Sequence, residues 1–124
     1  MEVKSYFFDS YVFYEIIEGN LAFKKYTEGI GIITTRLNLM ELHYGLLSLY
    51  GKEVADEHYN ALLEFVIDID DSIIKQANEF KFNNKKKKLS YVDCIGYTIA
   101  KKRNVKFLTG DVAFEDLDNV EFVL

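Results

Sequence analysis

The hydrophobic positions of this chain alternate between short continuous runs and stripes spaced three or four residues apart. Continuous apolar runs predict buried strands, and spaced stripes predict helices. The expected strands are residues 3–8, 31–34, 65–69, 105–109 and 121–123. The expected helices are 11–18, 22–26, 36–50, 52–64, one beginning at Asp70 or Asp71, 91–103, and a brief turn or helix over 112–117. Strands that alternate with helices indicate an α/β fold, with three layers in which helices flank a mainly parallel central sheet.

The breaks between these elements are glycines and polar residues, because the chain contains no proline. Gly51 separates two helices, and a polar hinge of two asparagines and four lysines precedes the helix at 91–103. There is no low-complexity linker and no long repeat. A length of 124 residues fits one domain and can enclose a hydrophobic core. We therefore expect a single domain over 1–124.

The composition is that of an ordinary soluble protein, with 49% hydrophobic and 28% charged residues. The one cysteine, Cys94, excludes an internal disulfide and suits a reducing compartment. No apolar run approaches the length of a membrane span, and the N-terminus lacks the features of a signal peptide. The expected location is the cytoplasm, without membrane association.

The net charge of −5 argues against a simple nucleic-acid binder, which would neutralise phosphates with lysine and arginine. Two bound divalent ions would change this charge to −1, however. The positive charge is also clustered in Lys85, Lys86, Lys87 and Lys88. This run is equally well interpreted as a solvated hinge or as a loop that contacts phosphates.

Four acidic residues stand where a site belongs in a parallel sheet. Asp9 and Asp111 follow expected strands, and ligands bind beyond the carboxyl ends of such strands. Glu41 shares a helix face with Asn38, and Asp93 lies in the first turn of its helix. Each acid also has a structural explanation. Asp9 and Asp93 could cap helices, Asp111 could form a turn, and Glu41 could be solvated.

Convergence of the four acids would have a chemical reason. Mg²⁺ and Mn²⁺ prefer carboxylate oxygens, and packed carboxylates repel one another unless cations neutralise them. A pair of such ions can activate water and stabilise the leaving oxygen of a phosphodiester. Ser10, Asn38 and Thr109 are suitable hydrogen-bond donors to orient the carboxylates.

The order and setting of these acids carry a resemblance to a known family. The motifs are Phe7-Phe8-Asp9-Ser10, Glu41-Leu42-His43-Tyr44-Gly45, Leu89-Ser90-Tyr91-Val92-Asp93, and Thr109-Gly110-Asp111 with Phe114 soon after. No single motif is specific, but the ordered set is similar to PIN-domain proteins across essentially the whole chain. The similarity is greatest to the toxin nucleases of VapBC-type toxin–antitoxin pairs.

The resemblance implies a divalent-metal-dependent endoribonuclease that leaves a 5′-phosphate and a 3′-hydroxyl. Asp9, Glu41, Asp93 and Asp111 would be its catalytic and metal-binding residues. It also implies a homodimer and a small antitoxin protein, which we expect to cover Tyr11, Tyr14 and Phe23 on the first helices. Some members have a fifth acid; Asp116 is the candidate, in competition with Glu115 and Asp118. Arg36 and the lysine run at 85–88 are candidate RNA contacts.

Other functions remain as alternatives. A haloacid-dehalogenase-like phosphatase also begins with an aspartate after its first strand, but it needs a second aspartate where Tyr11 stands. A receiver domain would also have an α/β fold, but this chain lacks the pair of acids that a receiver domain has near its N-terminus. A PIN-like interaction module that has lost catalysis is the non-enzymatic alternative, and the presence of all four acids argues against it.

Overall fold

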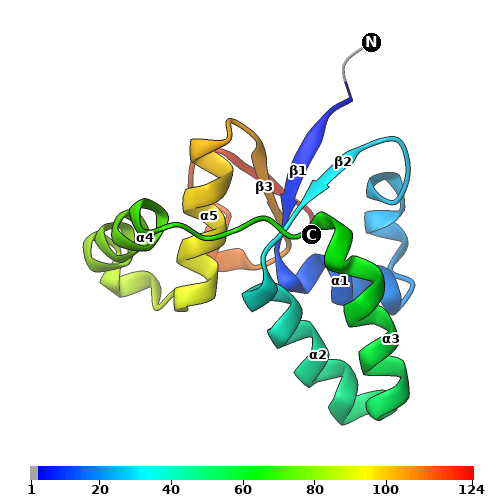
Figure 1. Ribbon diagram of the computed structural model, residues 1–124. Helices are drawn as coiled ribbons and strands as arrows, with labels where there is room; N and C mark the ends of the chain where they lie inside the picture. The colour runs from blue at the N-terminus through cyan, green and yellow to red at the C-terminus, as the bar shows by residue number, and fades with distance from the viewer. Residues whose placement is uncertain (1–2) are drawn as a thin grey trace.

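The computed structural model describes residues 3–124, which form an α/β domain around a four-stranded sheet (Figure 1). Its strands are β1 (Ser5–Phe8), β2 (Gly31–Ile33), β3 (Lys106–Thr109) and β4 (Val120–Phe122). They lie in the order β2-β1-β3-β4, and all three pairings are parallel. The expected fold class is therefore confirmed, with β1 and β3 in the centre.

Helices cover both faces of this sheet. The elements are α1 (Ser10–Ile17), α2 (Arg36–Tyr50), α3 (Lys52–Leu62), α4 (Asp71–Asn83) and α5 (Tyr91–Lys102), with short 3₁₀ turns η1 (Leu21–Tyr26), η2 (Leu63–Phe65), η3 (Lys85–Lys87) and η4 (Val112–Phe114). Tyr6 and Phe8 of β1 pack in one core cluster with residues of α1, α2 and α3, whereas Phe7 packs in a second cluster with residues of α4 and α5. Alternate side chains of one strand thus enter two different cores.

The strand expected at residues 65–69 does not form. Phe65 ends the turn η2, and Val66 makes only an isolated parallel bridge to Thr34. Ile67 and Ile69 instead pack against the α4–α5 core, so this segment carries the chain from one helical layer to the other (Figure 1). A short apolar run cannot reveal whether its backbone pairs with a strand or only its side chains are buried, and here the second holds.

Most other expected elements are found close to their predicted bounds. The segments at 22–26 and 112–117 contain 3₁₀ turns rather than α-helices. Asp70, not Asp71, caps α4, since its Oδ1 accepts a hydrogen bond from the backbone N–H of Ile73 at 2.9 Å. The polar hinge contains the turn η3 and ends at Lys88, whose φ of 54° is left-handed. Within residues 3–124 we find no helix with the length and apolar character needed to cross a bilayer.

Gly96 allows α5 to lie directly on the sheet. A Cβ atom at this position would stand 2.6 Å from Cε1 of Phe7 and 3.0 Å from Cε1 of Phe107, both fully buried rings. These rings are fixed in the core, so they cannot move aside cheaply. Gly96 therefore serves helix–sheet packing and does not face the acidic site.

We expect Gly96→Ala to lower the free energy of unfolding by about 1–2 kcal/mol, because overpacking outweighs the gain in helix propensity. Gly45→Ala is the matched control. Gly45 also lies within a helix, but the nearest atom to its added Cβ is Cε2 of Tyr14 at 3.9 Å. Urea denaturation should find this control as stable as the parent or slightly more so. Equal stability of the two variants would contradict the packing role of Gly96.

Candidate metal centre

Asp9 is the buried centre of the candidate site. It follows β1 directly, and its backbone N–H bonds to the carbonyl of Leu108 at 3.2 Å. Only 5% of Asp9 is exposed. Although it occupies the N-cap position of α1, its side chain makes no capping hydrogen bond. Its Oδ2 instead accepts a hydrogen bond from Oγ1 of Thr109 at 2.8 Å. The capping explanation for Asp9 is therefore wrong.

The surroundings of Asp9 disfavour its negative charge. The pKa of this carboxyl is raised from 3.8 to about 7, mainly by burial; the nearby charges of Asp93 and Glu41 contribute to the rise, and the hydrogen bond from Thr109 opposes it. A buried carboxylate beside like charges is unfavourable by itself. It becomes favourable when a cation stands beside it.

Glu41 is held over α1 by a chain of hydrogen bonds. Oγ of Ser10 donates to Oε1 of Glu41 at 2.7 Å, and Nδ2 of Asn38 donates to Oγ of Ser10 at 3.1 Å. Oγ1 of Thr35 donates to Oδ1 of Asn38 at 2.6 Å and also accepts from its backbone N–H at 3.2 Å. Partial burial raises the pKa of Glu41, and the nearby Asp93 adds to the shift. The chain thus joins the start of α2 to the start of α1.

Thr35, which takes part in this series of hydrogen bonds, was not among the expected site residues. Its position at the N-cap of α2, three residues before a polar Asn38, is a capping signal that the sequence already contains. The sequence alone could not show that the cap continues through Asn38 and Ser10 to a carboxylate on another helix.

Asp93 has the structural role that its sequence suggested. Ser90 and Asp93 form a capping box at the start of α5, in which Oδ2 of Asp93 accepts from the backbone N–H of Ser90 and Oγ of Ser90 accepts from the N–H of Asp93, both at 3.0 Å. Burial nevertheless raises the pKa of Asp93, the hydrogen bonds with Ser90 oppose this, and the charge of Asp111 adds to it. Asp93 is therefore both a cap and a member of the acidic group.

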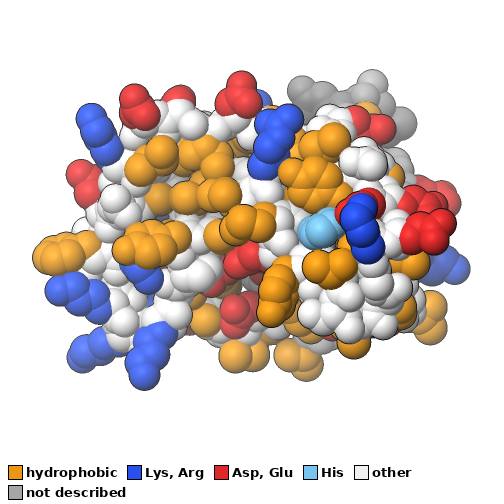
Figure 2. Space-filling view, turned by 60° about the horizontal axis from the view of Figure 1, so that its bottom comes forward, with side chains coloured by type: hydrophobic (Ala, Val, Ile, Leu, Met, Phe, Trp, Pro, Cys, Tyr) orange, Lys and Arg blue, Asp and Glu red, His pale blue; other side chains and the backbone are white. Residues whose placement is uncertain are grey.

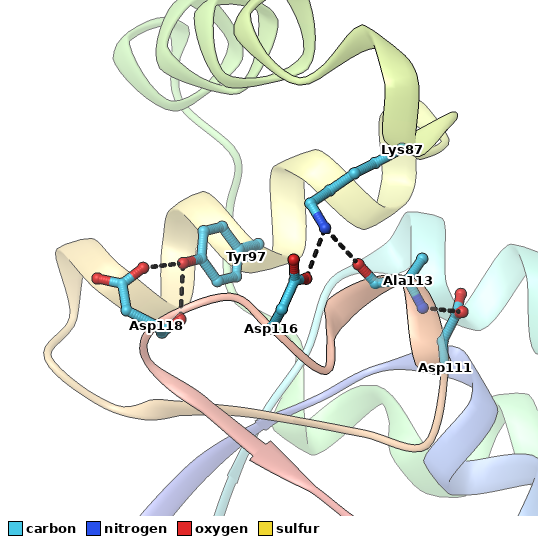
Figure 3. A network of polar contacts seen from close by, with 6 residues as sticks. All are labelled: Lys87, Tyr97, Asp111, Ala113, Asp116 and Asp118. Atoms are coloured by element: carbon cyan, nitrogen blue, oxygen red, sulfur yellow. Dashed lines mark hydrogen bonds and ion pairs between the residues drawn. The ribbon is translucent and has the colours of Figure 1, made fainter.

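Asp111 also combines two roles. Its Oδ1 accepts from the backbone N–H of Ala113 at 3.0 Å and caps η4 (Figure 3). Its own N–H donates to Oγ1 of Thr109 at 3.1 Å. Because the same hydroxyl donates to Asp9, Thr109 links the acids that follow β1 and β3.

The four acids lie at one end of the sheet. Asp9 and Asp111 follow the carboxyl ends of β1 and β3, and α1, which begins beside Asp9, carries the Ser10 that binds Glu41. The charges of Asp93 and Glu41 help to raise the pKa of Asp9, and the charge of Asp111 helps to raise that of Asp93, so the four carboxyl groups are near one another. In Figure 2, acidic side chains lie in the middle of the face that this end presents.

The donors suit a hard divalent cation. They are oxygen ligands throughout, and the central one is a buried carboxyl with a raised pKa. In the described part of the chain, no three acids, histidines or cysteines are gathered tightly enough to hold an ion by themselves. Mg²⁺ typically binds proteins through one or two carboxylates and keeps several waters, so these residues fit such an ion.

Asp116, the candidate fifth acid, is engaged elsewhere. Nζ of Lys87 lies 2.5 Å from its Oδ1 and 3.3 Å from the carbonyl oxygen of Ala113 (Figure 3). This ion pair lowers the pKa of Asp116. Lys87 therefore ties η3 to the connection between β3 and β4. Of the competing acids, Glu115 is exposed, and Asp118 accepts hydrogen bonds from the Tyr97 hydroxyl at 2.5 Å and from Lys101 at 3.3 Å.

Arg36, an expected RNA contact, lies on a different face of α2 from Glu41. It lines a pocket of about 570 Å³ with Met40 and His43 between α2 and α3. His43 points away from Glu41, as expected, and its Nε2 lies 2.8 Å from Oδ1 of Asp56. Cys94 is buried in the core, and burial raises the pKa of its thiol to about 11. A nucleophilic role for this thiol has no structural support.

Of the three aromatic residues that we expected a partner to cover, two are accessible and one is buried. Tyr11 is 40% exposed and Tyr14 is partly exposed, so a partner could reach both. The expectation is wrong for Phe23, which is only 1% exposed and packs against Tyr11 and Tyr26. Phe23 fills the core between α1 and η1. The sequence of a short helix looks the same whether its aromatic residue is buried in the core or exposed at an interface, so the sequence could not separate the two.

Comparison with known proteins places these features in a family. The chain resembles VapC20 of Mycobacterium tuberculosis, a toxin that cleaves the sarcin–ricin loop, with a TM-score of 0.80 and 18% identity over 96% of this chain and 99% of that one. It also resembles a chain of a toxin–antitoxin complex from Klebsiella pneumoniae, with a TM-score of 0.72 and 17% identity over 93% and 94% of the two chains. A third similar structure is VapBC2 of Rickettsia felis bound to promoter DNA, with a TM-score of 0.72 and 18% identity over 95% and 96%.

These identities are low, so the structural likeness establishes the fold and no more. A search of curated proteins found no significant match. The family model of the PIN domain, however, matches residues 6–120, which include all four acids, most of β1, and β2 and β3 in full, and which end at the first residue of β4. The chain therefore belongs to the PIN-domain family.

Proposed function

We propose that this protein is a divalent-metal-dependent endoribonuclease that hydrolyses RNA phosphodiesters. Asp9, Glu41, Asp93 and Asp111 would hold Mg²⁺ or Mn²⁺. The observation that carries the proposal is the burial of Asp9 at the end of β1, next to two further acids and with a pKa of about 7. Without a cation this arrangement lowers the stability of the fold. In a protein of the PIN-domain family, binding of a catalytic metal ion would account for it.

The side chains around the acids have defined tasks in this proposal. Thr109 orients Asp9 through the hydrogen bond at 2.8 Å, and Ser10 with Asn38 behind it orients Glu41. Such contacts fix the directions in which the carboxylate oxygens point. When bound, the divalent ion supplies positive charge to polarise the phosphodiester and to activate water.

The preference for RNA and the biological setting rest on the family likeness. The similar structures include a toxin that cleaves the sarcin–ricin loop and several toxin–antitoxin complexes. We infer that this chain is the toxin of a type II toxin–antitoxin pair, that it forms a homodimer, and that a small antitoxin covers exposed aromatic surface such as Tyr11. Co-purification with a second small chain encoded beside it would test the partner.

Comparing two variants separates the charge of Asp93 from its capping role. Asp93→Asn retains an oxygen that can accept from the Ser90 N–H, so α5 should keep its cap while metal-dependent cleavage falls about 100-fold. Ser90→Ala removes the other half of the box and should cost about 1 kcal/mol of stability, with most activity retained. The measurement is RNA cleavage across a Mn²⁺ titration, beside thermal unfolding.

The same titration tests the alternative of a PIN-like module without catalysis. In that case the acids would have structural roles only, and neither the parent nor Asp93→Asn would cleave RNA at any Mn²⁺ concentration. Full activity of Asp93→Asn would instead show that cleavage does not depend on this carboxylate. Either outcome would overturn the proposed site.

A further inference from the structure

A groove beside the acidic site combines exposed aromatic rings with lysines. It lies between the C-terminal end of α4 and the start of α5 and has a volume of about 630 Å³. Phe82 and Tyr91 line it and are 67% and 66% exposed. Lys81, Lys85 and Lys88 line it as well, and Glu79 is its one acidic lining residue among those the structure describes. We call it the α4–α5 groove.

The amino groups and rings of this groove lie together in pairs. Nζ of Lys85 is 4.2 Å from the ring centroid of Phe82, and Nζ of Lys81 is 4.9 Å from that of Tyr91. Lys81 also donates a hydrogen bond to the carbonyl oxygen of Leu89, which fixes its position beneath the groove. The rings are largely open to solvent although they are apolar, so they provide surface that a ligand can cover.

The groove adjoins the acidic site. Tyr91 and Asp93 lie in the same first turn of α5, and Lys81, which lines the groove, is close enough to Asp93 for its charge to oppose the rise in the pKa of that carboxyl. In Figure 2, lysines and hydrophobic side chains gather on the left, over the α4 end of the molecule, beside the acidic centre of the same face. A chain bound at the acids could therefore extend into the groove.

We propose that the α4–α5 groove binds an unpaired RNA segment next to the phosphodiester that the acids hold. Phe82 and Tyr91 would stack on bases, and Lys85 and Lys88 would contact phosphates. Stacking platforms within a positively charged groove are the means by which proteins bind single strands without reading their sequence. Bases in an A-form duplex are stacked inside it and cannot reach such rings. An acidic peptide would satisfy the lysines but leaves the two rings without a specific role.

This inference rests on the proposed function for its choice of RNA, but its test does not require cleavage. Binding of a fluorescently labelled oligouridine strand is measured by anisotropy in EDTA, where metal-dependent cleavage is stopped. Tyr91→Leu keeps an apolar side chain and removes the ring, and Tyr91→Phe keeps the ring. We expect Tyr91→Leu to weaken binding by about tenfold, the loss of one stacked base, and Tyr91→Phe to bind like the parent.

Salt dependence separates the lysines from the rings. Lys85→Gln combined with Lys88→Gln should reduce the slope of log K against log salt by about 1.4, because each phosphate contact on a single strand contributes about 0.7. Tyr91→Leu should leave that slope unchanged. The matched control is Lys75→Gln combined with Lys106→Gln, which removes two exposed lysines outside the groove and should change neither affinity nor slope.

Each outcome decides the proposal. If Tyr91→Leu binds oligouridine like the parent, the groove does not stack bases, and an acidic protein segment becomes the better occupant. If inorganic polyphosphate binding falls as much as oligouridine binding in Tyr91→Leu, the effect is not base stacking and the proposal fails. If the parent binds through the groove but does not cleave RNA with Mn²⁺, the proposed function fails while the groove stands.

Discussion

Replacing Asp9 with asparagine is expected to reduce metal-dependent RNA cleavage by about 1,000-fold or more, because a metal-ion contribution of several kcal/mol is lost and 1.4 kcal/mol is a factor of ten. Asp9 is the most buried of the four acids, and the charges of Asp93 and Glu41 help to raise its pKa. Asparagine has the same shape and can still accept the hydrogen bond from Thr109. The fold should therefore survive while activity does not.

Asp68→Asn is the control for this experiment. Asp68 is an exposed aspartate on the segment before α4, so its replacement removes one negative charge without touching the acidic site. Cleavage by this control should equal that of the parent. The assignment of Asp9 would be wrong if Asp9→Asn cleaved at the parental rate with Mg²⁺ or Mn²⁺, or if its loss of activity were accompanied by unfolding.

The metal-free protein is expected to lose stability as the pH rises from about 4 to about 7. The carboxyl of Asp9 has an ordinary pKa of 3.8 when unfolded and about 7 when folded. Within this interval the folded chain keeps a proton that the unfolded chain has released, so rising pH favours the unfolded state. The shift corresponds to at most roughly 4 kcal/mol, at 1.36 kcal/mol for each pKa unit.

Urea denaturation in EDTA at several pH values measures this effect. The difference between the parent and Asp9→Asn isolates Asp9, because all other titrating groups are common to both. Asp9→Asn should gain stability over the parent as the pH rises to 7, and the gain should stay constant above it. Adding Mn²⁺ at pH 8 should stabilise the parent more than the variant, since the ion binds the charged carboxylate. A parent and variant with parallel pH profiles would show that Asp9 titrates normally.

The local sequence already contains much of the acidic site. Asp9 and Asp111 were placed by the rule that parallel strands point their carboxyl ends to one edge, and the structure puts both there. Ser10, Asn38 and Thr109 were expected to orient carboxylates, and each takes part in hydrogen bonds of the acidic group. The capping box of Ser90 and Asp93 also follows from spacing within one helix turn.

Other features depended on contacts between distant segments. Thr35 joins the Glu41 network only because α1 and α2 start side by side, and Lys87 engages Asp116 only because η3 lies over the connection before β4. Residues 65–69 resemble a strand in composition but cross between layers, and Phe23 resembles an interface residue but fills the core. In each case the apolar or charged character of the residue can be read from the sequence, whereas the residue that it contacts depends on the tertiary packing.

The sequence by itself determined the parallel α/β architecture, the bounds of most helices, and the four acids with their order along the chain. These follow from periodicity and from rules that act within a few residues. Only the tertiary structure decided that Asp9 is buried among like charges, that Thr109 links it to Asp111, and that Phe82 and Tyr91 face one groove beside Asp93. Burial, electrostatic coupling and shared cavities depend on distances between segments far apart in the chain, and such distances exist only once the chain has folded.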